Sequence, residues 1–188
     1  MVIRGNSLDD TGGDGIIVSS TYGALMEYNT ISRANQRGTS ANAGMWPHNS
    51  DYAVMQYNEV YGTRYSGDGM GFDIDQLCNH CISHYNLGSG GYAYAPGSTA
   101  LFDFNCFYGT HPANEPEDNH RITSDPMLMD PGTVATGRNS AERYQLRPGS
   151  PCLSSGKIIP DNGGRDFQGY PVPSDRPPGI GAFAIRRD

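Results

Sequence analysis

The sequence has little of what builds helices or attracts polyanions. It contains a single lysine, Lys157, against twelve arginines, and five glutamates against fifteen aspartates. Good helix formers are therefore scarce, whereas 25 glycines, 13 prolines and many aromatic side chains favour turns and strands. This composition excludes a helical bundle. The net charge of −7 argues against nucleic acid and anionic membranes as partners, and no apolar run is long enough to span a bilayer as a helix.

The sequence also lacks a secretory signal at its start. Residues 1–6 already have the pattern of a strand and a turn, so we expect the chain to be part of a longer protein.

Cysteines are too few for a disulfide scaffold, and their number is compatible with either redox setting. Cys78 and Cys81 have the spacing of zinc ligands, but residues three apart on a strand face opposite sides. We therefore expect no structural metal there, and we expect Cys81 to pack inside, near Cys106. No cofactor is indicated, although aspartate-rich turns leave calcium open.

A short pattern recurs along the first 105 residues. It consists of an aliphatic residue, a variable residue, a polar residue, an aromatic residue and asparagine. The asparagines that end the clear copies are Asn29, Asn58, Asn86 and Asn105, spaced by 29, 28 and 19 residues, with a poorer copy ending at Asn6. A second motif, Gly-Asp-Gly followed by apolar residues, begins at Gly13 and again at Gly67.

Repeats of about 20 to 30 residues with two short strands each are typical of a solenoid of stacked β-coils. Asparagine suits the corners of such coils because it tolerates left-handed backbone and bonds to nearby main chain. We expect Asn29, Asn58 and Asn86 to lie at one corner, with their amides hydrogen-bonded along the axis.

Residues 68–75 with 81–86, and the segments 124–126, 144–151, 166–169 and 179–183, resemble parts of the right-handed parallel β-helix superfamily of polysaccharide-active proteins. The resemblance covers nearly the whole chain. It implies an all-β fold with about four to five coils in residues 1–110. Residues 111–188 would be an irregular C-terminal cap on the last coil, with Leu146 and Phe183 over its interior. It also implies a secreted, cell-surface or periplasmic protein.

Alternating side chains after each Gly-Asp-Gly motif define a candidate binding face. In the alignment of the coils, Asp73 and Asp75 point outward, and His48 stands opposite Asp73. On neighbouring coils, about 4.8 Å apart, the expected face comprises Trp46, His48, Asp73, Asp75, Tyr92 and Tyr94. Aromatic rings pack on the apolar faces of sugars, and carboxylates and imidazoles bond to hydroxyl groups.

The favoured interpretation is a carbohydrate-binding module for a plant-type polysaccharide such as xylan, tethered to a catalytic domain in a longer protein. The chain resembles β-helical modules that accompany xylan-degrading enzymes. Asp73 and Asp75 would repel uronates, which favours a neutral glycan.

Two alternatives remain open. Asp73 and Asp75 lie at a spacing that suits the acid and base of a glycoside hydrolase, or the chain is a structural solenoid spacer. A rival surface is the polar row that precedes the corner aromatics, made up of Glu27, Gln56, His84 and Asp103.

Overall fold

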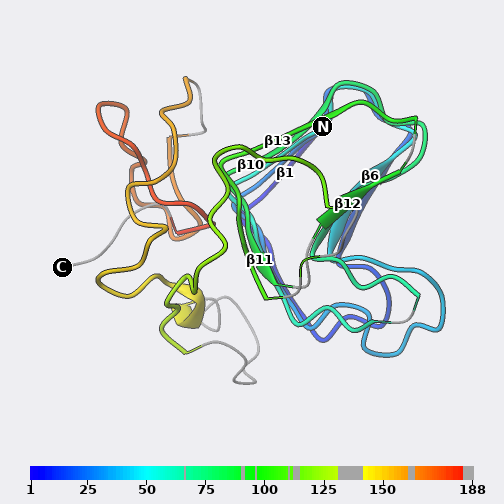
Figure 1. Cartoon of the computed structure of the whole chain (residues 1–188), viewed down its shortest axis with the longest axis horizontal. Coiled ribbons are helices and arrows are strands. Elements are labelled where there is room, and N and C mark those ends of the chain that lie inside the picture. Colours follow the sequence, from blue (N-terminus) through cyan, green and yellow to red (C-terminus); the bar gives the residue numbers. More distant parts are fainter. Residues whose placement is uncertain are drawn as a thin grey trace.

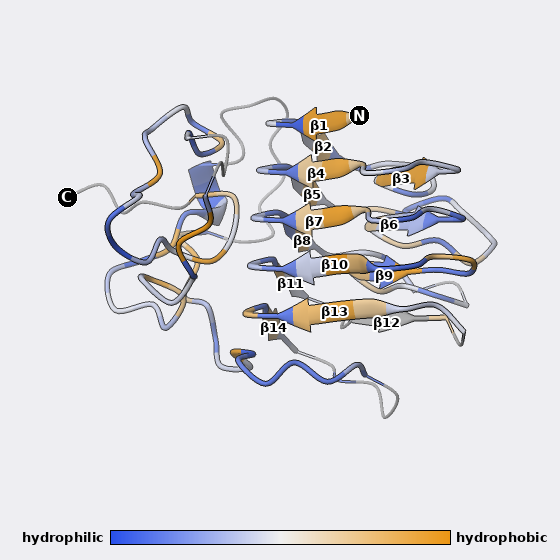
Figure 2. Ribbon diagram, turned by 90° about the horizontal axis from the view of Figure 1, so that it is seen from above, coloured by the Kyte–Doolittle hydropathy of each residue, from blue (hydrophilic) through white to orange (hydrophobic). Residues whose placement is uncertain are grey.

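Short parallel strands dominate the first 108 residues. The computed structural model describes residues 1–65, 67–89, 92–95, 97–109, 111, 115–130, 142–160 and 164–183. Within these residues, fourteen strands of three or four residues form three parallel sheets, here named A, B and C (Figures 1 and 2). Apart from one helical turn at residues 142–144, the regular structure of the described residues is therefore all-β, as the composition predicts.

Each sheet takes one strand from each successive repeat. Sheet A contains β1 (Val2–Arg4), β4 (Leu25–Glu27), β7 (Val54–Gln56), β10 (Cys81–His84) and β13 (Ala100–Asp103). Sheet B contains β2 (Ser7–Asp9), β5 (Thr30–Ser32), β8 (Glu59–Tyr61), β11 (Leu87–Ser89) and β14 (Cys106–Tyr108). Sheet C contains β3 (Ile16–Ser19), β6 (Met45–His48), β9 (Phe72–Ile74) and β12 (Tyr92–Tyr94). The chain thus visits the three sheets in turn. Each of the first four repeats has three strands where the sequence pattern predicts two, and the fifth contributes β13 and β14 within the described residues.

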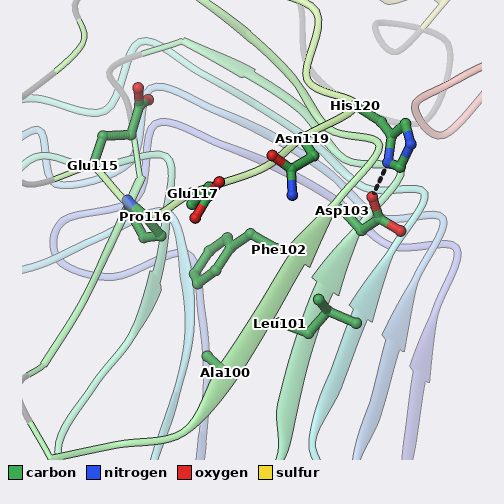
Figure 3. A pocket seen from close by; sticks show the side chains of 9 residues that line it. All are labelled: Ala100, Leu101, Phe102, Asp103, Glu115, Pro116, Glu117, Asn119 and His120. Carbon is green, nitrogen blue, oxygen red and sulfur yellow. Dashed lines mark hydrogen bonds and ion pairs between the residues drawn. The ribbon is translucent and has the colours of Figure 1, made fainter.

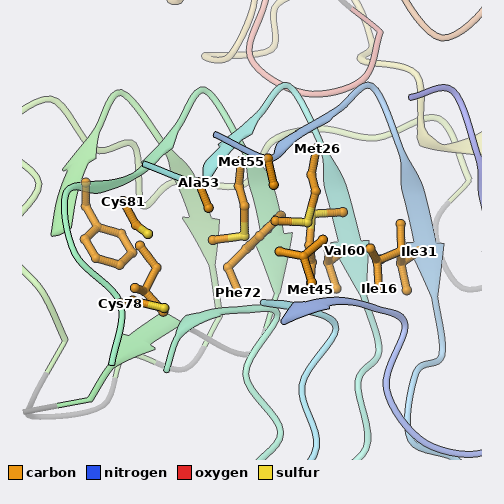
Figure 4. Packing of buried hydrophobic residues seen from close by; sticks show 14 of the residues in the cluster. Ile16, Met26, Ile31, Met45, Ala53, Met55, Val60, Phe72, Cys78 and Cys81 are labelled. Atoms are coloured by element: carbon orange, nitrogen blue, oxygen red, sulfur yellow. The ribbon is translucent and has the colours of Figure 1, made fainter. Parts of the chain in front are cut away.

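Side chains from the three sheets meet in one apolar cluster (Figure 4). Met26 of sheet A, Ile31 of sheet B and Met45 of sheet C all belong to it and are fully buried. Along β3, Ile16 and Val18 are buried whereas the residues between and after them are exposed, as alternation along a strand requires. The interior of the repeats is therefore the main hydrophobic core.

A column of glycines lets adjacent repeats approach closely just before sheet C. A Cβ atom on Gly15 would lie 2.3 Å from the carbonyl oxygen of Gly44, and one on Gly44 would lie 2.6 Å from that of Gly71. No side chain fits at either position. Close backbone packing thus explains the glycines at positions 15 and 44, and the equivalent residue of the next repeat is Gly71, two residues after the Gly-Asp-Gly copy that begins at Gly67.

The asparagine ladder predicted from the repeats is confirmed. The Nδ2 of Asn29 donates to Oδ1 of Asn58 at 2.9 Å, and the Nδ2 of Asn58 donates to Oδ1 of Asn86 at 3.0 Å. Asn86 donates to Asn105 in the same way at 3.3 Å, and Asn105 donates to the carboxylate of Asp118 at 2.9 Å. Every amide therefore donates toward the C-terminal end, where a side chain that only accepts ends the ladder.

The left-handed backbone at these corners belongs to the residue before each asparagine, which corrects the expectation above. Tyr28, Tyr57, Tyr85 and Phe104 have φ values of 52°, 53°, 55° and 55°. Their rings stack along the axis with centroids 5.1, 5.2 and 5.6 Å apart. Ring stacking between repeats offsets the conformational cost of positive φ in these aromatic residues.

The described residues 142–160 and 164–183 of the C-terminal segment lie along the side of the repeats (Figures 1 and 2), whereas Ile122 pairs with Cys106 of the last strand. Leu146 and Phe183, which we expected over the interior of the last coil, belong instead to a second apolar cluster with Tyr28, Tyr57 and Leu87. Main-chain bonds agree with this placement, since the N–H of residue 181 donates to the carbonyl of residue 85 at 3.0 Å. The outer side of the tyrosine column is apolar, so this surface is the one that the segment buries.

The cysteines have neighbours that differ from the expected ones. Cys78 and Cys81 are both buried in the main core and their thiols are in hydrogen-bonding contact. The chain turns between them, with a φ of 53° at His80, so the strand argument that separated them was wrong. Cys106 lies beside Cys152 in the second cluster and not beside Cys81.

Candidate functional site

The outer face of sheet C carries the residues chosen from the sequence. Trp46, His48, Asp73 and Asp75 are all half-buried on it or at its end. Met45 pairs with Phe72, so Trp46 is next to Asp73 and His48 is level with Asp75. The predicted alignment, which set His48 opposite Asp73, is off by two residues. A shift of two keeps every side chain on its face, so the composition of the face is unaffected.

The indole of Trp46 is held in a defined orientation. Its Nε1–H donates to Oδ1 of Asp14 at 2.8 Å, and the same oxygen accepts the main-chain N–H of Ala43 at 2.9 Å. The imidazole of His48 meets the indole at an angle of 75° with centroids 6.2 Å apart, and its Nδ1 lies 3.3 Å from Oγ of Ser19. The ring is therefore fixed at the surface, with its polar edge satisfied by the protein.

Asp73 has an unusual proton affinity for a carboxyl group. Its burial, with a smaller contribution from the charge of Asp75, raises the pKa of Asp73 to about 7. The Asp75 carboxylate accepts the main-chain N–H of Gln76 at 2.7 Å. Near neutral pH, Asp73 can therefore either donate or accept a hydrogen bond.

Tyr92 and Tyr94 lie on β12, but their side chains are outside the described part of the structure. Their backbone positions pair with Phe72 and Ile74, whereas Ala93 pairs with Asp73. The register therefore puts Ala93, and neither tyrosine, beside Asp73. The sequence did not predict this alignment of β12 with β9, because no Gly-Asp-Gly motif precedes β12 to show which of its residues are equivalent to those of β9.

The rival polar row forms a hydrogen-bonded network along sheet A. Glu27 is fully buried and accepts from Nε of Arg4 at 2.6 Å and from Nε2 of Gln56 at 2.6 Å. The oxygen of that Gln56 amide is left to accept Nε2–H of His84 at 3.0 Å. Burial lowers the pKa of His84 to about 4, so the imidazole is neutral at pH 7. These contacts give the inner members of the row a structural role between repeats.

The last member of the row, Asp103, borders a groove of about 630 Å³ (Figure 3). Its Oδ1 lies 2.6 Å from Nδ1 of His120, whose ring stacks on Phe104 with centroids 4.2 Å apart. On the other side of the groove, Glu115 is engaged by His111 and Arg121 at 2.9 and 3.3 Å. Of the residues at this groove, only Asp103 was predicted from the sequence, because the segment that forms the other wall lies outside the repeat pattern and has no motif of its own.

The described ranges contain neither a metal-ligand cluster nor a membrane-spanning helix. There, no three His, Cys, Asp or Glu side chains converge as metal ligands do. In the same part of the chain, no helix has the length and apolar character needed to cross a bilayer.

No protein-family model matches the chain, and no curated protein is significantly similar to it. The geometry of the surfaces described above is therefore the ground for a functional conclusion.

Proposed function

We propose that this chain is a carbohydrate-binding module with a right-handed parallel β-helix fold, which binds a neutral plant-type polysaccharide such as xylan on the outer face of sheet C. The regular passage through sheets A, B and C and the asparagine ladder support the β-helix. Such a module would be secreted, on the cell surface or in the periplasm, because plant polysaccharides lie outside cells. It would be tethered to a catalytic domain of a longer protein.

The observation that carries the proposal is Trp46, fixed at the surface beside Asp73. An indole ring that is already oriented loses little conformational entropy when a sugar ring packs on it. Its polar edge is bonded to Asp14, so its exposed surface is apolar and suits the C–H face of a pyranose. Asp73 and Asp75 next to it bond to hydroxyl groups, and the carboxylate of Asp75 repels uronates, which favours a neutral glycan.

The test is retention on polysaccharides in affinity gel electrophoresis, with Trp46→Ala beside the wild type. We expect Trp46→Ala to abolish retention on xylan while leaving the melting temperature nearly unchanged. Trp46→Phe, which keeps a ring and loses the bond to Asp14, should retain part of the binding. Unchanged retention of Trp46→Ala would refute this face as the site, and a wild type that binds no glycan would favour the structural spacer.

A second candidate function, glycoside hydrolysis, is favoured by one observation. Asp73 holds its proton up to about pH 7 next to a second carboxyl group, as the general acid of a glycosidase must. Asp73→Asn separates the two functions. It should weaken binding only modestly if the face binds, and it should eliminate the release of reducing sugar if the face is catalytic.

A further inference from the structure

Three aromatic rings project from the corner that follows sheet C. Tyr22 is 77% exposed, Tyr52 is 48% exposed, and His80 is exposed as well. The ring centroids of Tyr22 and Tyr52 are 5.2 Å apart, and those of Tyr52 and His80 are 5.0 Å apart. The three rings thus form a row along three successive repeats. Folding does not account for such exposure, because the burial of aromatic surface is what stabilises a protein.

The arrangement of the rings leaves apolar surface available to a ligand. Tyr52 and His80 are nearly parallel, with 17° between their planes, and cover each other's faces. Tyr22 is tilted by 57° from Tyr52, so the two do not stack face to face. The ring of Tyr22 therefore stabilises the contact between repeats less than a stacked ring would. More of its apolar surface is exposed to solvent.

Two grooves flank this row of rings. One, of about 520 Å³, is lined by Asn49, Asp51, Gln76, Leu77, Asn79 and Gly97. The other, of about 300 Å³, is lined by His80, Cys81, Ile82, Thr99, Ala100 and Leu101. The larger groove combines three carboxamides and one carboxylate with an aliphatic side chain, Leu77, that is 66% exposed.

The chemistry of the larger groove matches a neutral polyhydroxylated chain. Carboxamides both donate and accept hydrogen bonds, as neighbouring sugar hydroxyls do. Asn79 donates through Nδ2 to Oδ1 of Asp51 at 2.9 Å, which orients both groups. The groove has only one carboxylate among its lining residues and no basic side chain, so it suits neither a polycation nor a polyanion.

The groove begins where two strands of sheet C end. Asn49 directly follows His48, the last residue of β6, and Gln76 directly follows Asp75. A ligand that lies on Trp46 and runs toward the ends of these strands therefore enters the groove and then meets the ring row.

We propose that this corner is a second contact surface for the same glycan, in which the groove binds sugar hydroxyls and the rings of Tyr22 and Tyr52 pack on sugar faces. The inference rests on the proposed function, and it adds that the protein recognises a chain of several sugars, extending from Trp46 across the corner. Short oligosaccharides fill only the part of the site at Trp46.

The experiment compares long and short xylo-oligosaccharides on the double variant Tyr22→Ala/Tyr52→Ala. Tyr65→Ala is the matched control, because Tyr65 is also 77% exposed and lies outside the corner and its grooves. Binding is measured by calorimetry, and the fluorescence of Trp46, the single tryptophan, reports occupancy of sheet C separately. We expect affinity for the hexasaccharide to fall about tenfold in the double variant, while affinity for the disaccharide and both affinities of Tyr65→Ala stay unchanged.

The outcomes distinguish this inference from the proposed function. Wild-type affinity for the hexasaccharide in the double variant would overturn the corner site and leave the Trp46 site standing. Loss of hexasaccharide binding in the double variant but not in Trp46→Ala would support the corner and refute the Trp46 face. A wild type that binds neither oligosaccharide would overturn both. Asn49→Ala/Gln76→Ala, which alters two exposed groove residues, provides the same comparison if the tyrosine variant does not fold.

Discussion

The asparagine ladder should carry a large part of the protein's stability, and Asn58→Ala measures it. The Asn58 side chain is fully buried and makes four hydrogen bonds. Its Oδ1 accepts the main-chain N–H and the Nδ2 of Asn29 at 3.0 and 2.9 Å. Its Nδ2 donates to the carbonyl of Met26 at 2.9 Å and to Oδ1 of Asn86 at 3.0 Å.

Alanine removes all four bonds, but the free-energy cost differs among the groups that were bonded to Asn58. The main-chain N–H of Asn29 loses its acceptor inside the protein, which costs about 1–3 kcal/mol. The amide of Asn29 still donates to the carbonyl of Ile3 at 3.0 Å, and Oδ1 of Asn86 still accepts the main-chain N–H of residue 58 at 3.0 Å. The amide of Asn29 and the Oδ1 of Asn86 each lose one bond and keep another, which adds about 1 kcal/mol for each of the two groups. We therefore expect a total loss of about 3–5 kcal/mol.

Urea denaturation followed by Trp46 fluorescence measures this loss, and the melting temperature should fall by about 6–20 °C. Asn119→Ala is the control, because Asn119 is exposed and lies outside the ladder, and it should change stability by less than about 0.5 kcal/mol. Equal stabilities of the Asn58 and Asn119 variants would refute the reasoning.

Two further predictions concern pH and the C-terminal segment. Since the pKa of Asp73 rises to about 7 on folding, the native state keeps a proton that the unfolded state releases near pH 4, so this group lowers stability as pH rises from 4 to 7. Burial lowers the pKa of His84 to about 4, and this group acts in the opposite direction between pH 4 and 6.5. Asp73→Asn should therefore gain stability relative to the wild type as pH rises from 4 to 7 in urea titrations, and parallel curves would contradict this. Removal of residues 111–188 should expose the tyrosine column and Leu87 and leave a chain that aggregates or lacks cooperative unfolding. A soluble fragment 1–110 with a sharp urea transition would show that the segment is dispensable.

Much of the interior could be predicted from the sequence because it depends on local repetition. The copies that end at Asn29, Asn58 and Asn86 place identical amides at equivalent positions in successive repeats. Parallel strands with identical residues in register bring those residues together, and a buried amide has few other partners. The alternation around Asp73 likewise determined which side chains of sheet C face outward.

Sheet B was missed for an equally physical reason. All three residues of β5 (Thr30–Ser32) and of β8 (Glu59–Tyr61) are buried, so these strands show no alternation between apolar and polar residues. The C-terminal segment is what buries their outer side. For example, the main-chain N–H of Ala182 donates to Oε1 of Glu59 at 3.1 Å across 123 residues. A contact between segments so far apart in the chain produces no periodic sequence pattern in either segment.

By itself, then, the sequence determined the all-β class, the repeat, the amide ladder and the outward faces of β6 and β9, since these follow from neighbours at fixed spacing. Only the tertiary structure decided the two-residue register between Trp46 and Asp73, because either register keeps the same side chains outward. It also decided that the C-terminal segment covers the tyrosine column, and that Tyr22, Tyr52 and His80 form one row with a groove beside them. Those arrangements depend on how whole repeats pack, and the energy of packing is shared among residues that no local pattern connects.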